Sequence, residues 1–184
     1  MKRVFLFLAD GFEEIEASGT VDILRRGGLD VTTVSVAAAL QVPGAHGIPV
    51  VADALFAAVD FSGGDLLVLP GGGSGTKNLN AHEGLKNLLK QHAAAGKKIA
   101  AICAAPMVLG GLWLLQGKQA TCYPGMENTL DGATIADASV VKDGNIITGK
   151  GPGYTFEFAL ALVAELQGQA KADEVAAGML LSPQ

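Results

Sequence analysis

The 184-residue sequence predicts a three-layer α/β/α sandwich with a mostly parallel sheet and small antiparallel hairpins. Three observations indicate this fold class. Short, unbroken apolar runs are typical of strands covered on both faces, amphipathic helical segments alternate with them, and a hairpin signal lies in each half of the chain. With 49% hydrophobic residues, the chain is large enough to bury a core without disulfides. We expect one domain over residues 1–184.

The first half of the chain reads as strand, helix, strand, hairpin, strand and helix. Strands are expected at 4–8, 31–36 and 65–69. The helix expected over 13–26 starts with acids and ends with Arg25-Arg26 and Gly27-Gly28, in agreement with the helix dipole. Prolines and glycines interrupt 42–51, which predicts a small irregular hairpin. A glycine-rich loop over 70–75 then leads to a helix over 82–95.

The second half begins with a strand ending at Ile102, followed by Cys103 and a helix. A short strand is expected at 120–123. Segments 139–142 and 145–148 are expected to pair around Asp143-Gly144, which is a hairpin signal. Helices over 154–166 and 173–177 complete the pattern, and alternation of this kind favours a parallel sheet with helices on both faces.

Composition excludes several function classes. The net charge is −5 and basic residues never exceed two in a row, which argues against a nucleic-acid or anionic-membrane partner. The longest uncharged run, 99–115, is shorter than the ~20 residues of a membrane span. The apolar run after Lys2-Arg3 is too short for a signal peptide, so we expect a cytoplasmic protein with two free cysteines.

Cys103 is the first candidate for chemistry. It ends an apolar strand and precedes a helix, and such a turn exposes a nucleophile to the free N–H groups and positive dipole end of the helix. This setting favours a reactive thiolate at neutral pH. The alternative is that Cys103 is a small buried hydrophobe.

The glycine-rich loop is the second candidate. Residues 71–77 match neither the dinucleotide fingerprint nor the P-loop, so nucleotide binding is rejected and no cofactor is expected. Because loops after parallel strands converge at one sheet edge, the N–H groups of Gly72 and Ala104 are candidate oxyanion donors beside Cys103. An ordinary tight turn is the alternative.

The acids at 13–16 divide by helical register. Glu13 and Glu14 are expected to be solvated, whereas Glu16 shares a small, apolar face with Gly19, Thr20 and Ile23. A carboxyl group buried beside a thiolate is expected to stay protonated and to donate a hydrogen bond to sulfur.

The histidines supply no clear general base. His82 and His92 are expected to be solvated on a surface helix, and His46 is a candidate to line the pocket. The cysteines and histidines lack zinc-site spacing, so no metal site is expected.

Taken together, several motifs resemble the ThiJ/PfpI superfamily, within the branch of the parkinsonism-associated deglycase. The resemblance implies a flavodoxin-like homodimer, with Cys103 as an oxidation-prone nucleophile, Glu16 as its protonated partner and Gly72 and Ala104 as donors. It also implies cofactor-independent glyoxalase or deglycase activity on dicarbonyls or their protein adducts, oxidative-stress sensing, or chaperone activity. The matching motifs are Ala9-Asp10-Gly11-Phe12-Glu13-Glu14-Ile15-Glu16, Val21 to Gly28, Leu69-Pro70-Gly71-Gly72, Ala100 to Pro106 and Gly151-Pro152-Gly153.

The chain departs from the family pattern at three positions. Tyr123-Pro124 stands where the branch often has His-Pro, and His46 replaces the usual pocket arginine. We therefore place Tyr123, His46 and Gly73 in the expected pocket. Ala104 follows the cysteine where the protease-like branch has histidine, which argues against peptidase activity.

Two functions remain open from the sequence. One is an enzyme in which Cys103 attacks a dicarbonyl while Glu16 transfers a proton. The other is a sensor or chaperone whose Cys103 becomes a sulfinic acid with little or no turnover. Cys122 is expected to be inert, because strand alternation turns it away from residue 123.

Overall fold

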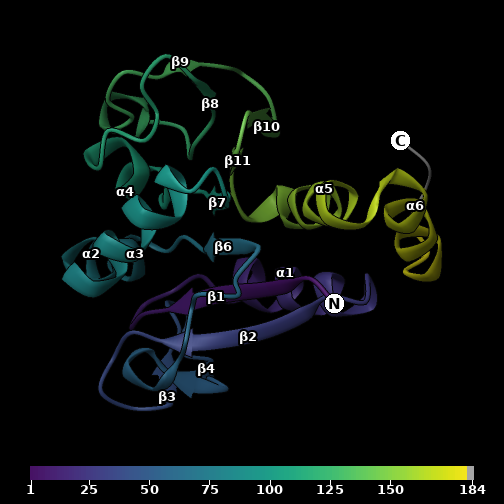
Figure 1. Ribbon diagram of the computed structural model, residues 1–184, viewed down its shortest axis with the longest axis horizontal. Coiled ribbons are helices and arrows are strands. Elements are labelled where there is room, and N and C mark those ends of the chain that lie inside the picture. The colour runs from purple at the N-terminus through teal and green to yellow at the C-terminus, as the bar shows by residue number, and fades with distance from the viewer. Residues whose placement is uncertain (182–184) are drawn as a thin grey trace.

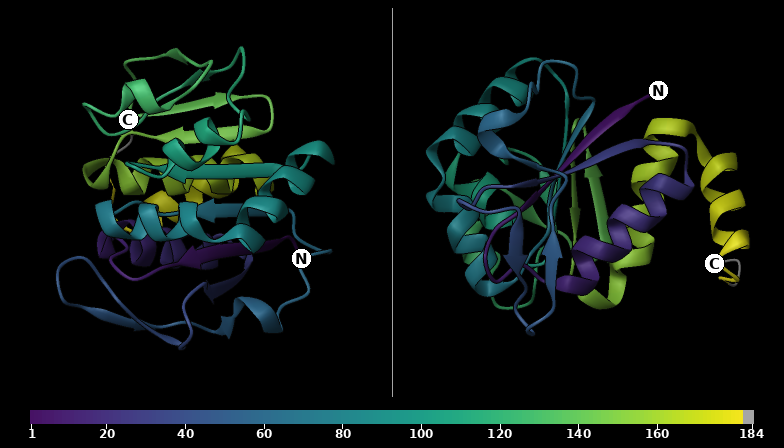
Figure 2. Two further views of the ribbon diagram at one scale, coloured as in Figure 1. Left: turned by 90° about the vertical axis from the view of Figure 1, so that its left-hand side faces the viewer. Right: turned by 90° about the horizontal axis from the view of Figure 1, so that it is seen from below.

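A computed structural model describes residues 1–181 and contains a seven-stranded sheet between two helical layers (Figures 1 and 2). The strand order is β10-β11-β7-β6-β1-β2-β5, and all neighbours pair in parallel except β10 with β11. The predicted flavodoxin-like sandwich is confirmed. The strands are β1 (Arg3–Leu8), β2 (Asp30–Ser35), β5 (Ala54–Leu55), β6 (Leu66–Leu69), β7 (Lys98–Ile102), β10 (Val140–Asp143) and β11 (Ile146–Gly149).

The central strand β1 explains why the sequence shows an unbroken apolar run there. Val4, Leu6 and Leu8 belong to one core cluster, whereas Phe5 and Phe7 belong to another. Successive side chains point to opposite faces of a strand, so a strand with helices on both faces must be apolar at every position. The two clusters are therefore the two cores of the sandwich, one on each face of the sheet.

The helices cover the sheet in two groups (Figure 2). The chain passes from β1 to β2 on one side and later returns to β6 on the other side of β1. Because such crossovers are right-handed, opposite directions of travel place the connecting helices on opposite faces. One face carries α1 (Glu14–Arg26), α5 (Thr155–Gln167) and α6 (Gln169–Gly178), and the other carries α2 (Gly73–Ala81), α3 (Glu83–Ala94) and α4 (Pro106–Gly111).

Two small strand pairs lie outside the main sheet. β3 (Gln41–Pro43) and β4 (Pro49–Val51) form the expected antiparallel hairpin. β8 (Gln119–Ala120) and β9 (Thr134–Ile135) pair in parallel. The short helical turns are η1 (Phe56–Ala58), η2 (Glu127–Thr129) and η3 (Pro152–Tyr154).

The structure corrects the sequence prediction at several elements. The glycine-rich loop is shorter than expected, because α2 already begins at Gly73. The strand expected at 120–123 covers only Gln119–Ala120, the helix expected at 173–177 extends over Gln169–Gly178, and β5 and β9 were not predicted. These elements are short or glycine-rich, so tertiary contacts rather than local pattern define them. Within residues 1–181, each helix is too short or too polar to cross a bilayer.

Candidate active site

Cys103 lies directly after β7 in a backbone conformation that few side chains adopt. Its φ is +65°, in the left-handed region, where a non-glycine residue is strained. Two hydrogen bonds hold this conformation: the Cys103 N–H donates to the Gly149 carbonyl at 2.9 Å, and the Tyr123 N–H donates to the Cys103 carbonyl at 2.8 Å. The end of β11 and the segment after β8 therefore fix the strained turn of Cys103.

The helix after Cys103 differs from the prediction. α4 is six residues long and begins at Pro106, so residues 103–105 form a turn rather than the start of the helix. The N–H groups that hydrogen bond to Cys103 belong to Ala104, in that turn, and to Gly72. Both N–H groups lower the pKa of the Cys103 thiol, although a helix N-terminus does not directly supply them. Their role as oxyanion donors stays a prediction.

Gly72 must be glycine for this arrangement. Its φ is +94°, and a Cβ there would lie 2.3 Å from the Gly11 carbonyl oxygen. The lack of a side chain lets the loop after β6 approach the β1–α1 turn closely. Gly73, which was expected in the pocket, is the first residue of α2, and nothing lies within 4 Å of the position of a Cβ there.

Glu16 is fully buried on the inward face of α1, as its register predicts. The Gly71 N–H donates to Glu16 Oε2 at 2.7 Å. A Cβ on Gly71 would stand 2.7 Å from Glu16 Oε2 and 3.0 Å from Cys103 Sγ. A methyl group at Gly71 would therefore contact both the Glu16 carboxyl group and the Cys103 sulfur, so glycine at this position lets the two groups lie close together. The local sequence pattern does not indicate this role of Gly71.

The two acidic groups at the site are coupled. Burial raises the pKa of Glu16 to about 7, against the hydrogen bonds from Gly71 and Cys103, which lower it. Burial also raises the pKa of the Cys103 thiol, as do the charge and hydrogen bond of an ionised Glu16, whereas the N–H groups of Gly72 and Ala104 lower it. A proton held by Glu16 removes its repulsion of the thiolate. Thiolate formation at Cys103 thus depends on Glu16 and stays a prediction.

The other acids of this segment correct the sequence prediction, because both are buried. Glu13 is the N-cap of α1, and its side chain accepts from the Glu16 N–H at 2.8 Å. Glu14 accepts from the backbone N–H of His46 at 2.6 Å and lies 2.9 Å from His46 Nδ1. The β3–β4 hairpin thus covers these carboxylates, a long-range contact that local sequence does not indicate.

His46 pairs with Glu14 rather than with Cys103. Burial opposes ionisation of Glu14, but hydrogen bonds from His46 and Ile48 outweigh burial and lower the pKa of Glu14 to about 2. The Glu14 hydrogen bond raises the pKa of His46 in turn. Ligand atoms of Glu13, Glu14 and His46 lie within 4.8 Å of one another, yet a metal ion there would have to break these hydrogen bonds.

The two remaining histidines also differ from the prediction of solvated side chains. His82 caps α3, because its Nδ1 accepts from the Leu85 N–H at 3.0 Å. His92 is 4% exposed, and burial, with the nearby charge of Lys97, lowers its pKa to about 4. Neither histidine lies with Cys103, so neither is a candidate base.

Tyr123 lies close to the turn that carries Cys103. Its N–H is bonded to the Cys103 carbonyl, and its ring is 3.3 Å from the position of a Cβ on Gly151. The side chain is half exposed. The backbone of Tyr123 therefore supports the turn of Cys103, and its place in a substrate pocket stays a prediction.

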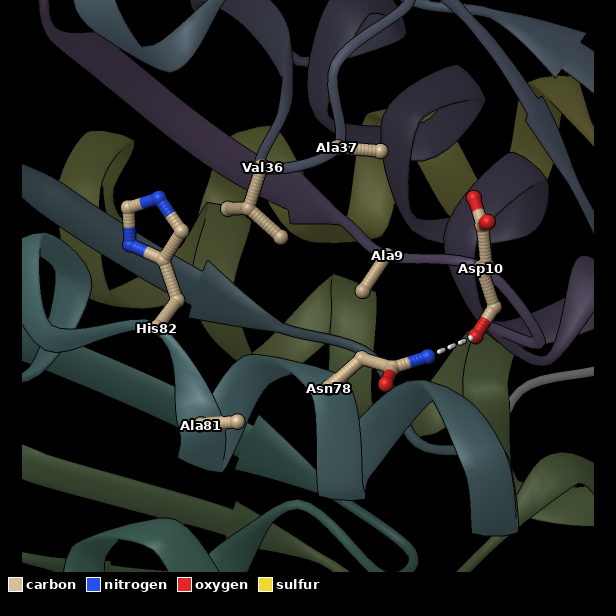
Figure 3. Close-up of a pocket in the computed structure, with 7 residues that line it drawn as sticks. All are labelled: Ala9, Asp10, Val36, Ala37, Asn78, Ala81 and His82. Carbon is tan, nitrogen blue, oxygen red and sulfur yellow. Dashed lines mark hydrogen bonds between the residues drawn. The ribbon is translucent and has the colours of Figure 1, made fainter.

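Two cavities among the described residues lie elsewhere. One of about 350 Å³ is bordered by the ends of β1 and β2 and by α2, where Asn78 Nδ2 donates to the Asp10 carbonyl at 2.8 Å (Figure 3). The other, of about 440 Å³, lies between α3 and the segment after η1. Neither is lined by Cys103 or Glu16, so the candidate site rests on its side-chain geometry rather than on cavity size.

Comparison with known proteins agrees with this geometry. Residues 2–165 match the model of the DJ-1/PfpI family. The chain is 43% identical over 99% of its length to "Protein DJ-1 homolog A" of Arabidopsis thaliana, but spans only 47% of that protein. It is 33% identical to a deglycase of Pyrococcus abyssi, covering 90% of this chain and 99% of that one.

A solved structure extends the match to three dimensions. Oxidized DJ-1 of Toxoplasma gondii superimposes with a TM-score of 0.96 at 36% identity, covering 100% of both chains. The family model matches most of the chain, and the structural match spans the sheet, both helical layers and the turn that carries Cys103. The chain therefore belongs to the DJ-1/PfpI family.

Proposed function

We propose that this protein is a cysteine-dependent, cofactor-independent glyoxalase or deglycase that removes reactive dicarbonyls or their adducts on protein side chains. The observation that carries the proposal is the meeting of Cys103 and Glu16 at Gly71, with N–H groups of Gly72 and Ala104 on the sulfur side. The deglycase of Pyrococcus abyssi among its relatives supports the choice of substrate class.

The residues can carry out the reaction with methylglyoxal as follows. The Cys103 thiolate forms a C–S bond to the aldehyde carbon, and the carbonyl oxygen takes the proton held by Glu16. The Glu16 carboxylate then removes the hydrogen of the former aldehyde carbon as a proton and returns it to the neighbouring carbon, while the proton on the first oxygen passes to the oxygen of the neighbouring carbon. The first carbon is thereby oxidised to a thioester and the second reduced to an alcohol. Water releases the 2-hydroxy acid and restores the thiol.

The backbone N–H groups supply the electrostatic part of this scheme. Negative charge develops on oxygen when sulfur adds to the carbonyl, and preorganised N–H donors are worth about 10²–10³ in rate at such sites. Gly72 and Ala104 donate to the sulfur itself, so an oxygen one bond away is within reach of the same groups. This scheme requires no metal or cofactor.

The decisive measurement is steady-state turnover of methylglyoxal by wild type, Cys103→Ser and Cys122→Ser. We expect Cys103→Ser to lose at least about 10³-fold in kcat/KM, because an alcohol is a far weaker nucleophile than a thiolate at neutral pH. Cys122→Ser should stay within about threefold of wild type, since Cys122 is in the apolar core on the other face of the sheet. Equal activity of Cys103→Ser and wild type contradicts the proposal.

A second candidate function is an oxidative-stress sensor or redox-regulated chaperone. Two equivalents of peroxide would convert the Cys103 thiol to a sulfinic acid with release of two waters. Glu16 and the two N–H donors would then hold the sulfinate oxygens. The similar Toxoplasma gondii structure is that of an oxidized DJ-1, which favours keeping this candidate.

Glu16→Gln separates the two candidates. Glutamine can still donate a hydrogen bond but cannot transfer a proton. We expect turnover to fall about 10²–10⁴-fold while sulfinate formation, measured as peroxide-dependent mass gain on Cys103, is largely kept. Equal loss of both, with an unchanged circular dichroism spectrum, would make Glu16 a structural residue only.

We also propose a cytoplasmic homodimer with no nucleic-acid or membrane partner. Both cysteines are free, which suits a reducing compartment. Exposed apolar side chains of adjacent helices, Ile15 on α1 and Phe156 on α5, support self-association. Light scattering after size exclusion measures the mass in solution, and a monomer at micromolar concentration contradicts the dimer.

A further inference from the structure

Glu13 contacts both groups that flank Cys103. Its side chain is only 9% exposed, although it stands at the start of a helix. Its Oε2 accepts from the Glu16 N–H at 2.8 Å, and its own N–H donates to the Gly71 carbonyl at 3.0 Å. Glu13 thus joins the first turn of α1 to the loop after β6.

These contacts are two of three hydrogen bonds that link Glu13, Glu16 and Gly71 next to the sulfur. The third hydrogen bond runs from the Gly71 N–H to Glu16 Oε2 at 2.7 Å. Each of Glu13, Glu16 and Gly71 is therefore bonded to the other two. Gly71 lies against both Glu16 Oε2 and Cys103 Sγ. A displacement of any of the three hydrogen-bonded residues therefore changes the position of the carboxyl group relative to the sulfur. Such a shift of 1 Å can cost about 10²-fold in rate.

The negative charge of Glu13 also affects the protonation of Glu16. Two ionisable groups face Glu16: Glu13, which caps the same helix, and Cys103, which lies in the turn after β7. His46 of the β3–β4 hairpin faces both neighbouring acids, because its Nδ1 lies 2.9 Å from Glu14 Oε2 and 3.9 Å from Glu13 Oε1. After burial, the charge of Glu13 is a further cause that raises the pKa of Glu16, and it therefore favours the protonated carboxyl group.

We propose that Glu13 is a positioning residue for the chemistry at Cys103, which holds Glu16 against the sulfur and sets the pH at which Cys103 becomes reactive. The role is carried by one carboxylate that both orients and repels Glu16. The inference rests on the proposed function in so far as Cys103 is the reactive group. It does not depend on which substrate Cys103 attacks.

The test is the pH dependence of Cys103 alkylation by iodoacetamide, with Cys122→Ser as background. Glu13→Gln keeps an acceptor for the Glu16 N–H but removes the charge. We expect the midpoint of its alkylation profile to rise by about half a pH unit to one unit, because Glu16 then ionises more readily and repels the thiolate; this is the size expected for removing a charge several Å away. Below the midpoint, alkylation should be about 3- to 10-fold slower than in the background protein.

Two further variants keep the result interpretable. Glu14→Gln removes the same charge one residue along, and its midpoint should stay at that of the background protein. Glu13→Asp keeps the charge and a good N-cap, and should also keep the midpoint. A Glu13→Gln midpoint equal to that of Glu14→Gln overturns the proposal, as does an equal shift in Glu13→Asp. Absence of methylglyoxal turnover with the Glu13→Gln shift present refutes the proposed function and leaves this inference standing.

Discussion

Cys103 and Cys122 are both buried, with exposed fractions of 7% and 4%, yet the two face different surroundings. Cys122 belongs to the apolar cluster on the α2, α3 and α4 side of the sheet, and Cys103 belongs to the cluster on the side of α1 and α5. Burial, and after it the charge of Glu127, raises the pKa of Cys122 to about 11. Burial, followed by the charge of Glu16, raises the pKa of Cys103 as well, to about 12, so the pKa values do not distinguish the two thiols. Cys122 is predicted to be inert because it lies in the apolar core.

Cys103 differs from Cys122 in the polar groups aimed at its sulfur, not in burial. Two backbone N–H groups favour its thiolate, and Glu16 can hold the proton that the thiol gives up. The backbone of Cys103 is also strained, with φ of +65°. The comparison shows that partners at the sulfur, and the strained turn that brings them together, separate a candidate nucleophile from a core residue.

The substitution expected to reduce the reactivity of Cys103 most, relative to Cys122, is Gly71→Ala. The new Cβ would stand 2.7 Å from both Cys103 Cβ and Glu16 Oε2, so one of these groups must move. We expect roughly a 10²-fold loss in the rate of Cys103 alkylation and of turnover, because both depend on how the carboxyl group meets the sulfur. Cys122 should react as slowly as before.

Gly73→Ala is the matched control for this change. Nothing lies within 4 Å of a Cβ at Gly73, and the residue begins α2, where alanine is favourable. Its alkylation rate should match that of wild type. A normal rate in Gly71→Ala, or an equal loss in both variants, contradicts the role given to Gly71.

His92 extends the comparison to a buried histidine, which is 4% exposed. Its Nε2 has no hydrogen-bond partner among the described residues, and its pKa is lowered to about 4. Below a pH of about 6.5 the unfolded chain takes up a proton that the folded chain refuses until about pH 4. Stability should therefore fall by about 2–3 kcal/mol as the pH drops through this window.

Urea unfolding of wild type and His92→Leu at several pH values between these limits measures the effect. We expect the free energy of unfolding of the variant to depend much less on pH in this range, since leucine is apolar and binds no proton. The same slope in both proteins would assign the acid sensitivity to other groups.

The sequence could predict the sheet and the loops that meet at the candidate site because both depend on local pattern. Unbroken apolar runs identify the strands, and the register of α1 turns Glu16 inward. The loops after parallel strands converge at one edge, which places Gly72 and Ala104 beside Cys103.

The parts that the sequence missed depend on contacts between distant segments. Glu13 and Glu14 resemble any solvated helix start until Gly71 and the β3–β4 hairpin cover them. His46 was expected near the pocket, but Glu14 holds it by two hydrogen bonds. Gly71 looked like one glycine among several, because only the three-dimensional structure shows what a methyl group there would displace.

The last and smallest expected effect concerns Tyr123, whose N–H donates to the Cys103 carbonyl. A histidine at this position could exchange protons near neutral pH, whereas a tyrosine with an ordinary pKa of ~10 positions a substrate but is a poor base. Tyr123 is half exposed and bonded through its N–H to the Cys103 carbonyl, so a smaller ring fits without moving the turn. We therefore expect Tyr123→His to raise kcat for methylglyoxal.

The increase should be modest, about threefold to tenfold, because Glu16 already transfers protons in the proposed reaction and general acid–base catalysis is worth about 10²–10⁴ in total. The gain should also appear as a new pH dependence of kcat near the pKa of histidine, ~6.5. Tyr123→Phe is the control, since it removes the hydroxyl and adds no base. If Tyr123→His alkylates normally at Cys103 but has the kcat of Tyr123→Phe, proton transfer at this position does not limit the reaction. That result would favour the oxidative-stress sensor over the enzyme, because a sensor needs Glu16 and the two N–H donors at Cys103 but no general base.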